Sequence, residues 1–137
     1  AYVEVRGVGE AGWAPELQWH VRRAAAWTGR TVASMQVYDL LRTIEFVKTL
    51  NGVNPQRIGI AARDEMGVVA LYAALLDGNV HSLLLQNPPD TQDVPSSADG
   101  RGPAIEMLNC LQITDVYQLP VFIYPTQTCC FDDTHGI

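Results

Sequence analysis

Residues 58–75 read IGIAARDEMGVVALYAAL, and this stretch decides the fold. Its first five residues form an apolar run with the length of a buried strand, which stops at three charged residues with Asp64 in the middle. A helical pattern begins directly behind them and ends where an aspartate and a glycine follow each other. The stretch therefore predicts a strand over 57–62, a sharp turn with Asp64 at its tip, and a helix over 65–76.

Helices and strands are also expected to alternate on both sides of this stretch. The patterns predict a strand over 2–6, helices over 16–27 and 33–50, a strand over 81–86, a helix near 103–110 and a strand over 120–124. Unbroken apolar strands separated by helices are typical of a mostly parallel sheet with helices on both faces. The length of 137 residues suits one core. The sequence predicts an α/β fold in a single domain, residues 1–137.

Composition and charge exclude several classes of function. The net charge of −6 argues against a nucleic-acid partner, because such proteins concentrate Lys and Arg on one surface. No apolar run approaches the roughly 20 residues that span a bilayer, and no secretory signal is recognisable, so no membrane partner is expected. The three cysteines show neither a disulfide framework nor metal-ligand spacing, so no metal or cofactor is expected. Compartment and oligomeric state are left open.

The glycine-rich segment after the first expected strand matches G-x-G-x-x-G at Gly7, Gly9 and Gly12. A dinucleotide site of this type needs a helix that begins within the glycines and an acidic residue after the next strand. Here Pro15 delays the helix, and the following segments are helical before another strand occurs. We interpret the glycines as a turn that leads a loop away from the sheet.

Three short segments resemble a known family. Residues 53–60 read VNPQRIGI, residues 67–74 read GVVALYAA, and residues 5–9 read VRGVG. They are similar to the V-D-P-x-R-I-G-V strand, the G-x-x-A-L-Y-A-A helix and the R-G-x-G strand end of acetyl-xylan-esterase-like α/β-hydrolases. The resemblance covers the middle and later part of that domain, so we expect a partial hydrolase-like fold that lacks the strands before Tyr2. It implies a soluble hydrolase of carboxylic esters, with a small-molecule or carbohydrate ester as substrate.

The nucleophile motif departs from the family. In α/β-hydrolases, G-x-S-x-G places a serine on a strained turn between strand and helix. Residues 62–66 read ARDEM here, so Asp64 stands where the serine would be, and Ala62 and Met66 replace the two glycines. By the same resemblance, the Glu65 amide is the expected oxyanion donor.

The remaining catalytic partners are expected near the end of the chain. His135 precedes a glycine, which resembles the family's H-G context for the catalytic histidine, and Asp132 or Asp133 is the candidate acid. The other two histidines are poorly placed, since His20 lies on a helix and His81 opens a strand at its amino end. Asp115 is a third candidate for the acid, but its sequence context favours a turn or helix-cap residue.

Three interpretations of Asp64 stay open. It caps the helix behind it, or it is a carboxylate nucleophile of the kind that cleaves carbon–halogen or epoxide bonds, or it is the remnant of a lost catalytic turn. The first and third make the chain a catalytically inactive hydrolase-like domain that binds a carbohydrate or a partner, or supports a larger protein. Sugar stacking is the role that Trp13, Trp19 and Trp27 would then have. The second makes it a hydrolase that acts on a small neutral substrate.

Overall fold

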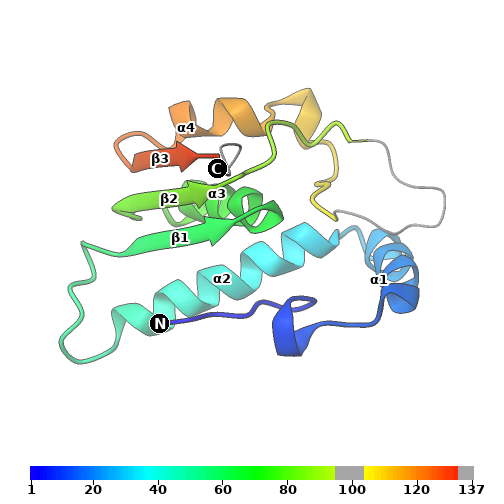
Figure 1. The fold of residues 1–137 in the computed structure, drawn as a ribbon, viewed down its shortest axis with the longest axis horizontal. Helices are drawn as coiled ribbons and strands as arrows, with labels where there is room; N and C mark the ends of the chain where they lie inside the picture. Colours follow the sequence, from blue (N-terminus) through cyan, green and yellow to red (C-terminus); the bar gives the residue numbers. More distant parts are fainter. Residues whose placement is uncertain (95–103, 133–137) are drawn as a thin grey trace, which may run out of the picture.

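The computed structural model describes residues 1–94 and 104–132, and its fold is of the α/β class. Its strands form a parallel sheet in the order β1-β2-β3 (Figure 1). The strands are β1 Gly59–Arg63, β2 Ser82–Gln86 and β3 Gln127–Phe131; the helices are α1 Pro15–Trp27, α2 Val32–Lys48, α3 Glu65–Asp77 and α4 Leu119–Phe122; short 3-10 turns are η1 Gly9–Ala11, η2 Cys110–Gln112 and η3 Val116–Gln118.

Helix α3, which the sequence predicts over 65–76, forms the centre of the core. Every residue from Gly67 to Ala74 is buried, because this helix contacts β1 and β2 on one side and α2 and α4 on others. A helix that is apolar on nearly all sides is stable only in such a position. It ends at Gly78, whose φ of 69° lies in the left-handed region that glycine adopts without strain.

Helix α2 packs against α3 and begins at a well-formed cap. The Ser34 amide donates to Thr31 Oγ1 at 3.1 Å, and the Thr31 amide donates to Ser34 Oγ at 3.0 Å. This capping box satisfies two amides that the first helical turn leaves without partners. At the other end, Lys48 Nζ lies 2.6 Å from Asp77 Oδ1 and ties the ends of α2 and α3 together. The prediction of a helix over 33–50 is confirmed to within two residues.

The described helices cover one face of the sheet rather than two. Leu83 and Leu85 on β2 are buried in the core, whereas Leu84 between them is 48% exposed. In register beside Leu84 are Ala61 on β1 and Cys129 on β3, both exposed. Figure 1 shows α3 behind the sheet and this opposite face toward the viewer. The expectation of helices on both faces is therefore not met by the part of the chain that the structure describes.

The segment over 2–6 is extended but forms no strand, so that prediction is wrong. A strand needs a neighbour with which to exchange backbone hydrogen bonds. Here the Gln36 side chain on α2 donates to the Arg6 carbonyl oxygen at 3.0 Å, and Arg6 Nε donates to Asp39 Oδ2 at 2.7 Å. The segment is thus attached to α2 through side chains rather than to the sheet.

The predictions for the region before β3 are also wrong. Residues 120–124 belong mostly to α4, and the strand lies later, at Gln127–Phe131. Leu119 and Ile123, four residues apart, are both buried, which suits a helical period and not a strand. The helix expected near 103–110 is absent from its described part, 104–110, in which η2 begins only at Cys110.

Candidate active site

The turn between β1 and α3 has an unusual backbone at Asp64. Its φ of 52° and ψ of −133° lie outside the regions that residues with a side chain normally adopt. Such a conformation costs on the order of 1–3 kcal/mol and occurs mostly at functional sites. The predicted strand, sharp turn and helix are all present. The backbone strain lies at Asp64, the residue in the nucleophile position.

Backbone hydrogen bonds hold the turn on both sides. The Asp64 amide donates to the carbonyl oxygen of Gln86 at the end of β2, at 2.9 Å. The Asp64 carbonyl oxygen accepts from the Gly67 amide, also at 2.9 Å. The next residue of the β2 end, Asn87, donates its amide to the Phe131 carbonyl oxygen of β3 at 2.9 Å. The carboxyl ends of all three strands are thus linked, and the surrounding structure fixes the strained residue.

The Asp64 side chain does not cap α3, so the cap interpretation is wrong. It accepts no capping hydrogen bond from the helix, and it is 50% exposed. Its one ion pair among the described residues is with Arg63 Nε, 3.2 Å from Oδ2, and Arg63 is 70% exposed. Exposed pairs of this kind contribute little to stability. The Asp64 side chain is therefore half-exposed at the carboxyl end of β1, directly before the start of α3.

The two residues that replace the motif glycines do not prevent the turn. Ala62 and Met66 are partly buried and pack against the core on the helix-covered face. The close approach occurs one residue later, at Gly67, where an added Cβ would lie 2.9 Å from Pro88 Cβ. Gly67 therefore lets the first turn of α3 pass next to the loop that follows β2.

The candidate partners of Asp64 are only partly described. Asp132 follows β3 directly and is exposed. Because β2 lies between β1 and β3, the backbones at Asp64 and Asp132 are separated by two strand spacings, about 10 Å. Both residues follow the carboxyl ends of their strands, and their carboxylates are not in contact. Asp133 and His135 lie outside the described residues.

The two described histidines, His20 and His81, do not lie at the carboxyl ends of the strands. His81 precedes β2, so the length of a five-residue strand, about 16 Å, separates it from the carboxyl edge. His20 stacks edge-on against Trp19 on α1, with 4.9 Å between ring centroids, and α1 contacts α2. Neither histidine therefore lies next to Asp64.

Asp115 is a cap residue, as the sequence predicts, and it also holds the loop after β2. Its carboxylate accepts from the amides of Gln92 and Val116, both at 2.7 Å, and from Thr91 Oγ1 at 2.5 Å. Burial is the largest single influence and raises the pKa, but these three hydrogen bonds together outweigh it and lower the pKa of Asp115. The link to Thr91 and Gln92 has no sequence signal, because the two segments are 23 or 24 residues apart.

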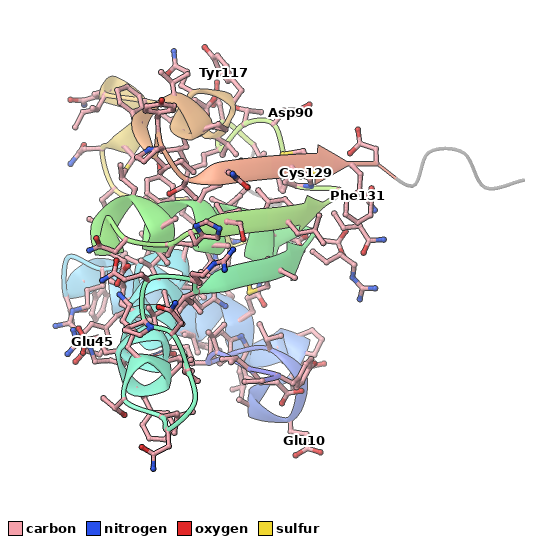
Figure 2. The ribbon with its side chains drawn as sticks, turned by 90° about the vertical axis from the view of Figure 1, so that its left-hand side faces the viewer. Glu10, Glu45, Asp90, Tyr117, Cys129 and Phe131 are labelled. Carbon is pink, nitrogen blue, oxygen red and sulfur yellow. The ribbon has the colours of Figure 1, made fainter. Side chains whose placement is uncertain are left out.

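The sequence did not indicate two residues near the carboxyl ends of the strands, Asp90 and Cys130. Asp90, in the loop after β2, accepts from the Tyr117 amide at 3.1 Å through its backbone (Figure 2). Cys130, an exposed residue near the end of β3, has the pKa of its thiol raised, first by partial burial of the sulfur and then by the negative groups Cys129, Asp132 and Asp90. Asp90 lies in the loop beyond the end of β2, and this position is the signal that could have found it, whereas Cys130 lies within β3 and has no such signal.

Other kinds of site find no support in the described residues. Within residues 1–94 and 104–132, no group of three or more His, Cys, Asp or Glu side chains could hold a metal ion. None of the helices there has the length and apolar character needed to cross a membrane. The glycine segment forms η1, and α1 begins only at Pro15. Cys110, Cys129 and Cys130 are free thiols.

Comparison with known proteins adds no family. No protein-family model, no curated protein and no solved structure matches this chain. Function therefore has to be argued from the geometry around Asp64.

Proposed function

We propose that this chain carries the nucleophile of an α/β-hydrolase-like enzyme related to esterases, in which Asp64 replaces the serine. The strongest support is the strained backbone of Asp64, together with the fact that its carboxylate makes no capping hydrogen bond to α3. Strain of this size persists where the surrounding structure enforces it, and here hydrogen bonds to Gln86 and from Gly67 do so. A helix cap would need neither the strain nor the exposure.

The location supports binding of a small molecule. In open parallel sheets, ligands bind beyond the carboxyl ends of the strands, where Asp64 and Asp132 both stand. Asp64 also precedes α3, whose amino end has a partial positive charge. Negative charge that develops at Asp64 during a reaction would therefore be stabilised by the helix and by the Glu65 amide.

The chemistry of a carboxylate nucleophile points to an alkyl electrophile. One Asp64 oxygen attacks an sp³ carbon and a carbon–oxygen bond forms; the halide leaves, or the epoxide carbon–oxygen bond opens and its oxygen takes a proton from water. Water then attacks the carboxyl carbon of this ester, transfers a proton to a base, and releases the alcohol while the Asp64 carboxylate returns. His135 is the candidate base. Attack on a carboxylic ester would instead give a reactive anhydride, so small neutral epoxides and alkyl halides are the favoured substrate class.

One observation favours a second candidate function. Arg63 Nε lies 3.2 Å from the Asp64 carboxylate, which draws the nucleophile toward its own neighbour and lowers its reactivity. In that case the chain is a catalytically inactive hydrolase-like domain that binds a carbohydrate or a partner.

The test is turnover of styrene oxide and butyl bromide by the purified chain, with p-nitrophenyl acetate as the ester control. We expect Asp64→Asn to reduce diol or alcohol formation at least 100-fold, and His135→Phe to accumulate a covalent ester that intact mass spectrometry detects. Glu45→Gln, which changes an exposed acid on α2 away from the strand ends, is the matched control and should keep full activity. Equal turnover by Asp64→Asn and the unaltered chain would refute the nucleophile, and a folded chain without any turnover supports the inactive domain.

A further inference from the structure

The connection from α2 to β1 has an asparagine followed by a glycine, Asn51 and Gly52, at its surface (Figure 1). Helix α2 ends at Lys48, and beyond it the Val53 amide donates to the Leu50 carbonyl oxygen at 3.2 Å. Asn51 and Gly52 are therefore the two central residues of a turn, and both are exposed. Gly52 has a φ of 83°, in the left-handed region that glycine adopts without strain.

Little holds the peptide unit between these two residues in one orientation. Among the described residues, neither the Asn51 side chain, nor its carbonyl oxygen, nor the Gly52 amide has a hydrogen-bond partner. A Cβ added at Gly52 would meet no atom within 4 Å. The Gly52 nitrogen is therefore accessible, and the chain around it can rotate until this nitrogen faces the Asn51 side chain.

These are the conditions under which an asparagine, a thermolabile residue, reacts with its own backbone. The Gly52 nitrogen loses its proton to a base and attacks the side-chain carbonyl carbon of Asn51, so that a carbon–nitrogen bond closes a cyclic imide. The bond to the side-chain nitrogen breaks, and this nitrogen leaves as ammonia after it takes a proton from water. Water then opens the imide at either of its carbonyl carbons, which gives aspartate or isoaspartate.

The other asparagines of the chain, all of which the structure describes, lack these conditions. Asn54 and Asn87 each precede a proline, which has no N–H with which to attack. The Asn79 side chain is engaged, because it donates to a main-chain carbonyl oxygen at 3.2 Å. Asn109 is followed by an amide that donates to another carbonyl oxygen at 3.3 Å. Asn51 alone combines an unbound side chain with an unbound amide behind it.

A second pair shows how the fold can protect such a site. Asp77 also precedes a glycine, Gly78, and aspartate can close the same ring. Here the Gly78 amide donates to the Ala74 carbonyl oxygen at 3.0 Å. The Asp77 side chain is 9% exposed and lies 2.6 Å from Lys48 Nζ. The glycine nitrogen is thus engaged at the end of α3, whereas in the turn at Gly52 it is not.

We propose that Asn51 is a modification site of this protein, at which attack by the Gly52 amide converts the folded chain, without any enzyme, to forms with isoaspartate or aspartate at residue 51. The product adds a negative charge shortly after α2, whose carboxyl end already has a partial negative charge. Isoaspartate also lengthens the main chain between α2 and β1 by a carbon atom. This inference does not depend on the chemistry of Asp64.

The experiment is incubation of the folded chain in mildly alkaline buffer, followed by mass spectrometry of the tryptic peptide 49–57. Conversion adds about 1 Da to this peptide. Fragmentation assigns the change to a residue, and Asn54 in the same peptide is an internal control. We expect Asn51 to convert at least about tenfold faster than Asn54, which lacks the attacking N–H. The rate should lie within about threefold of that in the synthetic peptide TLNGVNPQR, because an exposed turn opens at little cost.

Two variants separate the structure of the turn from its sequence. Gly52→Ala places a Cβ beside the attacking nitrogen and should slow conversion at least about tenfold. Asp77→Asn is the matched control, because it creates a second asparagine before a glycine whose amide is bound to Ala74. Residue 77 should stay unconverted while Asn51 of the same chain converts, with circular dichroism verifying the fold.

Three results would overturn the proposal. The first is an Asn51 that stays intact in the folded chain while the synthetic peptide converts, because the fold would then protect the turn. The second is conversion of residue 51 at an unchanged rate in Gly52→Ala, which would exclude attack by the glycine nitrogen. The third is equal conversion of residues 51 and 77 in folded Asp77→Asn.

Discussion

Replacement of Asp64 by glycine is expected to stabilise the protein while it removes the carboxylate. At φ 52° and ψ −133°, a residue with a Cβ is strained by about 1–3 kcal/mol, and glycine is not. Against this gain, glycine adds about 0.5–1 kcal/mol of backbone freedom to the unfolded chain. Loss of the exposed ion pair with Arg63 costs about 0.5 kcal/mol more. The net expectation is a gain of roughly 1 kcal/mol in the free energy of unfolding.

Thermal and urea denaturation measure this gain. For a chain of 137 residues, the average unfolding entropy makes 1 kcal/mol equivalent to about 3 °C in Tm. Asp64→Ala removes the same carboxylate but keeps a Cβ, so it should show no gain. If Asp64 were instead a helix cap, alanine would cost about 1 kcal/mol and glycine a few tenths. An Asp64→Gly variant that is less stable than the unaltered chain would therefore refute the strain at residue 64.

Two further predictions concern the elements around the turn. Gly67→Ala should lower the free energy of unfolding by about 1–2 kcal/mol in urea denaturation, because contact with Pro88 outweighs the better helix propensity of alanine; an unchanged or higher midpoint would contradict the close approach. Folding lowers the pKa of Asp115, so its contribution is present above the ordinary value of 3.8 and is lost as pH falls through the folded pKa. Asp115→Asn should therefore cost about 1 kcal/mol at pH 7, and the difference in stability should shrink only as the pH falls below 3.8 and through the folded pKa of Asp115; parallel stability curves would rule this out.

The central part of the fold could be predicted because its residues carry strong local patterns. The apolar run of β1, the amphipathic period of α2, and the Asp77-Gly78 pair that ends α3 are strong local signals, and β1, α2, α3 and β2 all form close to their expected positions. Asp115 was likewise interpretable as a cap from its local sequence.

The errors occur where tertiary contacts decide. Residues 2–6 alternate like a strand, but without a neighbouring strand they attach to α2 through Arg6 and Gln36. The run 120–124 is short and apolar, so periodicity alone could not separate a strand from the helix that buries Leu119 and Ile123. The uncovered face of the sheet could not be foreseen either, because burial depends on which helices pack there.

The candidate site, like the fold, was predicted only in part from the sequence. A turn between strand and helix at Asp64 follows from sequence, but the sign of φ and the missing cap do not. Only the structure shows that the Gln86 and Gly67 backbones hold this residue and that Asp132 stands two strands away. The positions of Asp90 and of the loop held by Asp115 depend on contacts between distant segments, which local patterns cannot reveal.

The most direct test of the Asp64 nucleophile is a single turnover of styrene oxide in ¹⁸O-labelled water, followed by mass spectrometry of the peptide that contains residue 64. If Asp64 forms the ester, water attacks its carboxyl carbon and leaves one ¹⁸O atom in the aspartate, so the peptide gains about 2 Da while the diol carries no label. Label in the diol alone, with none at residue 64, would show that water attacks the substrate directly and would contradict the account.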